Sequence, residues 1–178
     1  MSDSRWSTGR ILLIAGRIVL GGIFIAAAYY KLEPRIPSQP WSVAAVRTSL
    51  TMFGFQVDSY QMLSPESVNL VARTLPFFEL LLGVWLVSGI WLRIPSLVTT
   101  LMLGGFLAAM IRAYVLRLEI VCGCFGAGGE KVGPMSFLRD GSFFALSLAV
   151  TIGAFLVARK RSAPESSSAS TAELQQAR

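Results

Sequence analysis

The sequence predicts an all-α integral membrane protein built as a four-helix bundle. The chain has 178 residues, of which 53% are hydrophobic and 15% are charged, and its mean hydropathy is +0.59. Soluble domains carry about 25% charged residues. A helix needs about 20 apolar residues, each rising 1.5 Å, to cross a hydrocarbon core. Segments of this kind occur at residues 11–30, 68–92, 94–116 and 137–158.

The first predicted span begins after a basic, polar segment, as a cleaved signal peptide also does. Its apolar stretch, residues 11–30, is interrupted by Arg17. It is therefore longer and more polar than the apolar core of about 7 to 15 residues that such signals use. We expect residues 11–30 to remain as a helix, preceded by a cytoplasmic segment, residues 1–9.

A shorter helix is predicted between the first two spans. The segment around Trp41–Phe55 mixes aromatic, aliphatic and polar residues, which favours an amphipathic helix lying on the membrane. Ser64, Pro65 and Glu66 then supply an N-cap, a first-turn proline and a first-turn acid, so they predict the start of the second span. The second and third spans are separated by little more than residues 93–95, which predicts a tight antiparallel hairpin.

The orientation follows from the number of spans and from the basic residues. Four spans place both termini on one side of the membrane and both long loops on the other. The number of Lys and Arg is similar on the two sides and does not fix the orientation, but those on the terminal side lie closest to the span ends, which predicts cytoplasmic termini in a bacterial inner membrane. The net charge of +6 is thus assigned to lipid headgroups, and nucleic acid is not expected as a partner. Residues 10–158 form the predicted membrane domain, and the polar segment 159–178 is expected to be disordered.

The loop between the third and fourth spans carries the candidate catalytic residues. The chain has only two cysteines, Cys122 and Cys124, and no histidine. In the predicted orientation both thiols face an oxidising periplasm. A disulfide across one intervening residue is hard to form without strain, and a strained disulfide is readily passed on to other thiols. Three basic residues close in sequence could lower a thiol pKa and favour the thiolate: Arg117, Lys131 and Arg139.

Other chemistries for this loop are weaker. The two cysteines could form a purely structural disulfide or stay inert. They cannot complete a four-ligand zinc site without further ligands, so no metal is predicted. The sequence contains no phosphate-binding loop and no nucleophile elbow, and the lack of histidine excludes histidine-based acid–base chemistry.

Four charged residues fall inside the predicted spans, where burial of a charge needs a reason. Measured from the inner ends, helical rise places Arg17 at roughly 10 Å, Glu79 at roughly 18 Å, and both Arg112 and Asp140 near 27 Å. We therefore predict two ion pairs, Arg112 with Asp140 just below the cysteine loop and Arg17 with Glu79. Such pairs lock a bundle together. The alternative is a proton or quinone site around Glu79.

Several short motifs together resemble a known family. They are Cys122-Gly123-Cys124-Phe125-Gly126, Arg139-Asp140, Leu75-Pro76-x-x-Glu79-x-x-x-Gly83 and Lys31-Leu32-x-Pro34. Over about residues 10–158 the chain resembles the MauE branch of the DoxX-like membrane proteins. The resemblance implies a four-helix inner-membrane protein of methylamine utilisation. Its expected partners are a periplasmic thioredoxin-like protein and a disulfide-rich client, such as the small subunit of methylamine dehydrogenase.

The architecture is also similar to vitamin K epoxide reductase and to bacterial disulfide-generating membrane enzymes. Those proteins use a Cys-x-x-Cys motif and a second cysteine pair, both absent here. Three functions remain open. The first is thiol–disulfide exchange at Cys122 and Cys124, and the second is a non-catalytic membrane subunit that docks a redox partner. The third is a quinone-binding or transport subunit centred on Glu79 and Arg17, with quinone as the one candidate cofactor.

Overall fold

The computed structural model describes residues 3–34, 40–118, 120–122 and 131–176. These residues form five helices: α1 (Asp3–Leu32), α2 (Val43–Ser59), α3 (Pro65–Ser88), α4 (Arg93–Val115) and α5 (Pro134–Gln176). Within the described ranges, the one extended pairing is an isolated bridge between Val121 and Lys131. The all-α prediction is confirmed.

Four helices contain segments long and apolar enough to cross a membrane: Gly9–Leu32, Pro65–Ser88, Arg93–Val115 and Pro134–Arg159. They confirm the four predicted spans. The second begins at Pro65 as predicted, after Ser64 in an extended conformation. It ends four residues earlier than predicted, at Ser88, because Gly89 adopts a left-handed conformation with φ +70°, the usual cap of a helix C-terminus.

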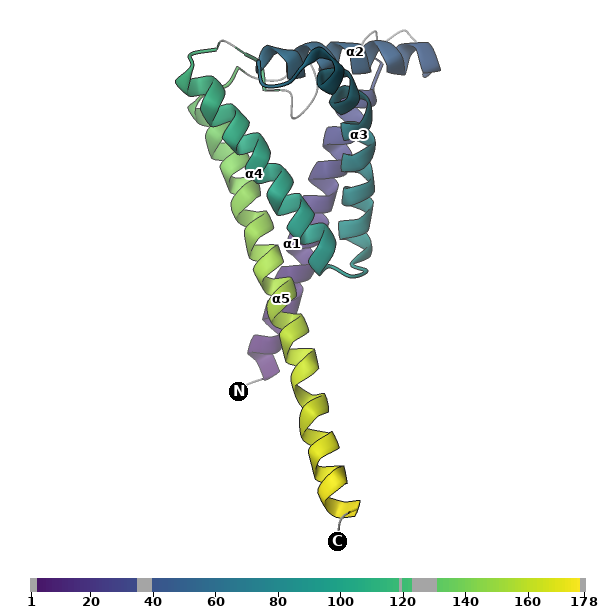
Figure 1. Ribbon diagram of the computed structural model, residues 1–178, viewed down its shortest axis with the longest axis vertical. Helices are drawn as coiled ribbons and strands as arrows, with labels where there is room; N and C mark the ends of the chain where they lie inside the picture. Colours follow the sequence, from purple (N-terminus) through teal and green to yellow (C-terminus); the bar gives the residue numbers. More distant parts are fainter. Residues whose placement is uncertain (1–2, 35–39, 119, 123–130, 177–178) are drawn as a thin grey trace.

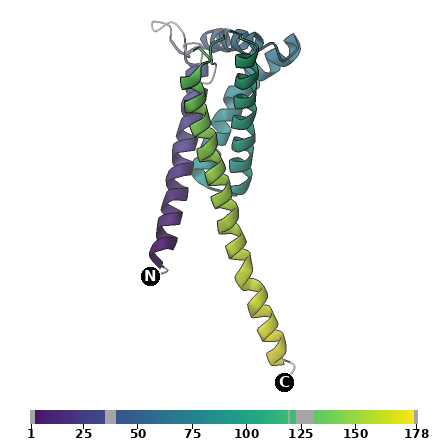
Figure 2. The same cartoon turned by 90° about the vertical axis from the view of Figure 1, so that its left-hand side faces the viewer.

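The spans associate as two pairs. The most extensive contacts join α1 to α3 and α4 to α5, and the two pairs diverge like the arms of a V (Figures 1 and 2). Leu20, Leu86 and Val150 form a buried apolar cluster that ties α5 to the first pair. The consecutive helices α3 and α4 run antiparallel through a short turn but touch little beyond it. The predicted tight hairpin is therefore limited to the turn itself.

The α1–α3 pair depends on two glycines that bring the backbones together. A Cβ atom added at Gly21 would lie 2.8 Å from the carbonyl oxygen of Gly83, and one added at Gly83 would lie 2.8 Å from the carbonyl oxygen of Gly21. Small residues at helix crossings allow this approach in membrane proteins. The neighbouring Gly22 is exposed and has no atom within 4 Å of an added Cβ.

These two adjacent glycines make a matched test of the packing. Gly21→Ala is expected to destabilise the protein by about 1–3 kcal/mol, because the added methyl group overpacks the crossing. Gly22→Ala is expected to be neutral or to stabilise by about 0.5–1 kcal/mol through better helix propensity. Unfolding of the purified protein in detergent measures both. Equal effects of the two substitutions would contradict the close crossing.

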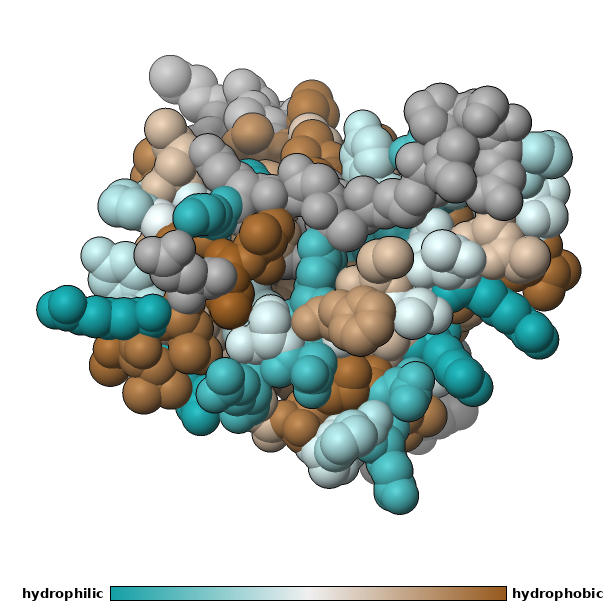
Figure 3. Space-filling view, turned by 90° about the horizontal axis from the view of Figure 1, so that it is seen from above, coloured by the Kyte–Doolittle hydropathy of each residue, from teal (hydrophilic) through white to brown (hydrophobic). Residues whose placement is uncertain are grey.

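The helix α2 lies across one end of the bundle (Figure 1), and the predicted short helix between the first two spans is confirmed. Its N-cap is Ser42, whose side chain accepts a hydrogen bond from the backbone N–H of Ala45 at 3.2 Å. Ala45, Ser49 and Phe53 form its buried face. The hydroxyl of Ser49 donates to the carbonyl oxygen of Glu33 at 2.7 Å, which holds α2 against the exit of α1. Seen from this end, hydrophilic and hydrophobic side chains are mixed over the surface (Figure 3).

The start of α1 and the end of α5 lie at the opposite end of the bundle from α2 (Figures 1 and 2). The backbone of α5 stays helical to Gln176, although we predict a disordered segment from residue 159. A physical reason is that extending a helix costs far less than starting one, so a stable span propagates its geometry into the residues that follow. The division into segments 1–9, 10–158 and 159–178 stays a prediction.

Candidate functional site

Between α4 and α5, residues 120–122 pair with residues 131–132, and this pairing fixes the position of Cys122. We call these two paired segments the neck. Val121 and Lys131 form an antiparallel bridge, and the backbone N–H of Val132 donates to the carbonyl oxygen of Ile120 at 3.0 Å. The hydroxyl of Ser136, in the first turn of α5, donates to the carbonyl oxygen of Lys131 at 3.1 Å. The neck is thereby attached to α5. Cys124 lies outside the described residues.

The thiol of Cys122 is enclosed by charged and sulfur-containing side chains. Cys122 is 1% exposed, and its Sγ lies 3.5 Å from Nη2 of Arg139 and 3.6 Å from Oδ2 of Asp140. The Sδ atom of Met110, on α4, is 3.8 Å away. Nε of Arg139 donates to Oδ1 of Asp140 at 3.0 Å. We call Met110, Cys122, Arg139 and Asp140 the thiol cluster.

This arrangement suits thiolate chemistry. A guanidinium beside a sulfur stabilises the thiolate, which is the reactive form of cysteine. The carboxylate of Asp140 accepts a hydrogen bond from the thiol, so it is positioned to take the proton as the thiolate forms. Of the basic residues predicted to assist the cysteines, Arg139 contacts the sulfur, whereas Arg117 is exposed beyond the end of α4.

The predicted ion pair between Arg112 and Asp140 is wrong. Arg112 is exposed and donates from Nη1 to the carbonyl oxygen of Tyr60 at 3.0 Å, whereas Asp140 pairs with Arg139. Equal depth in the membrane does not ensure that two side chains face each other. Arg112 faces the connection between α2 and α3, while Asp140 faces the neck.

The predicted ion pair between Arg17 and Glu79 is also wrong, because Glu79 pairs with Lys31. Nζ of Lys31 donates to both carboxylate oxygens of Glu79 at 2.6 Å. Lys31 and Glu79 are each 2% exposed, and the ring centroid of Phe53, on α2, lies 5.3 Å from the same ammonium. This buried pair connects the end of α1 to the middle of α3.

Arg17 lies beside the C-terminal end of α3, whereas Glu79 is in the middle of that helix. Its guanidinium is packed against Gly89, where any side chain would collide with it. Gly89 is ten residues beyond Glu79, or about 15 Å along a helix. Depths counted from the helix ends mislead here because α1 begins well beyond the level at which α3 ends, so the two ends are not level (Figure 1). At this position Arg17 places a cation beside the C-terminus of α3, where the helix dipole favours positive charge.

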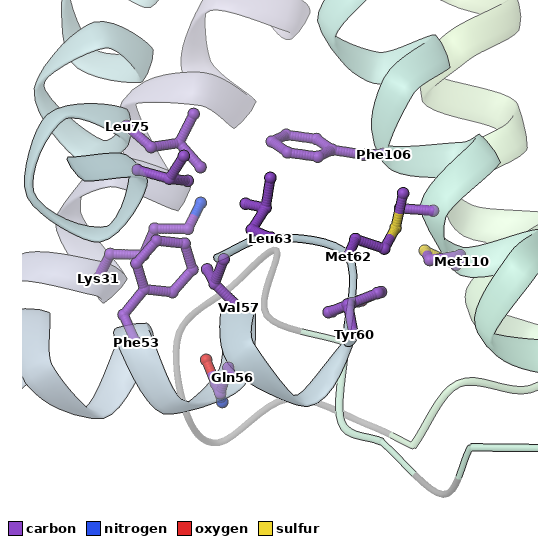
Figure 4. Close-up of a pocket in the computed structure, with 12 residues that line it drawn as sticks. Lys31, Phe53, Gln56, Val57, Tyr60, Met62, Leu63, Leu75, Phe106 and Met110 are labelled. Atoms are coloured by element: carbon purple, nitrogen blue, oxygen red, sulfur yellow. The ribbon is translucent and has the colours of Figure 1, made fainter. Parts of the chain in front are cut away.

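A cavity of about 220 Å³ lies between α3 and α4, beneath α2. Its lining is apolar and aromatic, apart from Lys31, Gln56 and Tyr60. Lys31, Phe53 and Leu75 line one side, and Phe106 and Met110 line the other (Figure 4). Met110 thus belongs to both the cavity wall and the thiol cluster. The cavity depends on the divergence of α3 and α4, which no local sequence pattern indicates.

These features define a class: a multi-pass helical membrane protein that holds one thiol, a guanidinium and a carboxylate together at the end of its bundle. A family model described as methylamine utilisation protein MauE matches residues 9–155. The chain belongs to this family, as its motifs indicate, and is therefore a membrane protein of methylamine utilisation. The comparisons with curated proteins and with solved structures gave no match.

Proposed function

We propose that this protein exchanges disulfides with a periplasmic thioredoxin-like protein, and so supports the maturation of a disulfide-rich client such as the small subunit of methylamine dehydrogenase. The observation that carries the proposal is the contact of Cys122 Sγ with both Arg139 and Asp140. A structural cysteine needs neither a guanidinium nor a carboxylate, whereas a reactive one uses the first to stabilise its thiolate.

The proposed orientation has the termini in the cytoplasm and the thiol cluster on the periplasmic side of the inner membrane. Arg10, Arg17 and Arg93 line one cleft, at the end of the bundle that carries the termini. The opposite end also has arginines, among them Arg47 and Arg73, so the proposal rests on how close the basic residues of the terminal end lie to the span ends, where such residues favour the cytoplasmic side. The thiols are then in the compartment where disulfides form and persist.

The burial of Cys122 supports different roles for the two cysteines. In the oxidised protein, a thiolate of the partner attacks the sulfur of Cys124, and Cys122 leaves as a thiolate that Arg139 stabilises. A second partner thiolate then attacks the mixed disulfide at the partner's sulfur and releases Cys124. Two electrons pass from the partner dithiol to the Cys122–Cys124 disulfide. Cys122, at 1% exposed, is shielded from a bulky partner, so Cys124 carries the mixed disulfide.

Single cysteine substitutions test these roles. Cys122→Ser is expected to accumulate a covalent adduct with an oxidised thioredoxin-like partner, because Cys124 attacks and no neighbouring thiol resolves the product. Cys124→Ser is the matched control and is expected to trap little or none. Non-reducing electrophoresis of membranes quenched with an alkylating agent detects the adduct. Equal trapping by both variants would contradict the division of roles. Normal client maturation in the double serine variant would leave only an anchoring function.

A further inference from the structure

We infer that the cavity between α3 and α4 binds the ring of a quinone, which reoxidises the thiols of the cluster. This inference rests on the proposed function, because a protein that gives its disulfide to a partner must regain it from an oxidant. Three observations carry it: the lining of the cavity, the position of the Lys31 ammonium, and the contact of one wall with Cys122.

The lining suits a flat apolar ring. Phe53 and Phe106 face the cavity from opposite sides, with Leu75 beside them (Figure 4). Aromatic side chains favour stacked or edge-on contacts with a second ring. The volume of about 220 Å³ is below the roughly 300 Å³ at which pockets for drug-sized ligands begin. It therefore fits one substituted ring, and a longer isoprenoid tail has to extend into the lipid.

Lys31 gives this apolar cavity a group that recognises carbonyl oxygen. A lysine ammonium has three N–H donors, and both oxygens of Glu79 together engage two of them. Among the residues that the structure describes, the ammonium has one other neighbour of this kind, the ring of Phe53 in the cavity wall, so its third donor can turn to a ligand in the cavity. A quinone has two carbonyl acceptors and becomes more negative at oxygen as it is reduced, so a fixed ammonium favours both binding and reduction. A lipid acyl chain has no group for this donor.

The wall formed by Met110 brings the cavity next to the thiol. Met110 lines the cavity, and its Sδ is 3.8 Å from Sγ of Cys122. Methionine is flexible and adapts to neighbouring groups, so the ring and the sulfur are separated by one adaptable side chain. In the reaction, the two S–H bonds of Cys122 and Cys124 break and one S–S bond forms. The two electrons and two protons released convert the quinone to the quinol, with Asp140 as first acceptor of the proton from Cys122.

The experiment uses the full-length protein in detergent, fully reduced, mixed with a short-chain benzoquinone. The wild-type protein is expected to form one quinol per cysteine pair, followed by ultraviolet absorbance and by loss of alkylatable thiol. Ala109→Phe adds a ring to the cavity wall, and overpacking of this kind is expected to slow quinol formation by about tenfold or more. Ala108→Phe is the control, because Ala108 is exposed on the same helix, and it should oxidise at the wild-type rate.

Two results would overturn the inference: no quinol from the wild-type protein, or an Ala109→Phe variant as fast as Ala108→Phe. If Ala109→Phe fails to fold, photolabelling of the wild-type protein with an azido-benzoquinone replaces it. The label is expected on the α4 peptide that contains Phe106 and Met110, and labelling confined to other helices would also overturn the inference. Exchange of the wild-type protein with glutathione disulfide is measured separately. If the protein exchanges with glutathione disulfide but forms no quinol, the proposed disulfide exchange stands and the quinone inference fails. If it forms quinol but does not exchange, the proposed disulfide exchange is contradicted.

Discussion

Replacing Lys31 by methionine is expected to destabilise the protein by about 3–5 kcal/mol, the cost of leaving a buried charge without its partner. Glu79 is 2% exposed, and Lys31 donates to both of its carboxylate oxygens. Methionine keeps the length and apolar stem of lysine but removes the cation. The carboxylate then has to take up a proton or draw water into the bundle. Unfolding of the purified variant in detergent, or its level in the membrane, measures the loss.

The double variant Lys31→Met/Glu79→Met separates the cost of an unpaired charge from the loss of packing. Removing both charges eliminates the desolvation cost along with the attraction, so the double variant is expected to be about as stable as the wild-type protein. A double variant destabilised by the sum of the losses in Lys31→Met and Glu79→Met would show that the two side chains act independently. It would contradict the ion pair as the link between α1 and α3.

Arg139→Gln is expected to slow the release of Cys122 from its disulfide by about ten- to hundredfold, because a hydrogen bond to a charged group contributes about 1.5–3 kcal/mol. The guanidinium lies 3.5 Å from Sγ, and the glutamine amide cannot neutralise a thiolate. Stopped-flow reduction of the protein by a dithiol gives the rate. Arg139→Lys is expected to recover part of it, since lysine keeps the charge but not the planar fork that also holds Asp140.

Arg117→Gln provides the matched control for this prediction. Arg117 has the same charge and follows α4 at an exposed position, so its loss changes the net charge without removing a contact to the sulfur. We expect the wild-type rate for this variant. If Arg117→Gln and Arg139→Gln slowed the reduction equally, the effect would come from the overall field of the loop and not from the thiol cluster.

The sequence predicts the helices better than their contacts. Span positions follow from runs of apolar residues, and the start of α3 follows from Ser64 and Pro65, which act through the local backbone. The early end of α3 also has a local signal in Gly89, which prediction from hydropathy alone overlooks. Pairing of charges depends on how far each helix extends and which way each face turns. Neither property is encoded locally, so the partners predicted for Arg17 and Arg112 are wrong.

The same distinction holds for the candidate site: its local residues are predictable from the sequence, and its contacts between helices are not. The cysteines and Arg139 are identifiable because their residue types carry the chemistry and lie close in sequence. Met110 and Lys31 come from other helices and resemble ordinary span residues. Lys31 belongs to one of the family motifs, but its pairing with Glu79 has a different signal: the crossing of Gly21 and Gly83 sets an antiparallel register that brings Glu79 within reach of the end of α1. That signal becomes readable only once the two glycines are known to meet.

The double membership of Met110 has a consequence for any variant at this residue. Its thioether borders the hollow under α2 on one side and the Cys122 sulfur on the other. A shorter side chain at this position is expected to enlarge the cavity and also to remove a neighbour of the sulfur. The cavity and the Cys122 sulfur thus share one side chain, so a change at Met110 is expected to affect both without any motion of the helices.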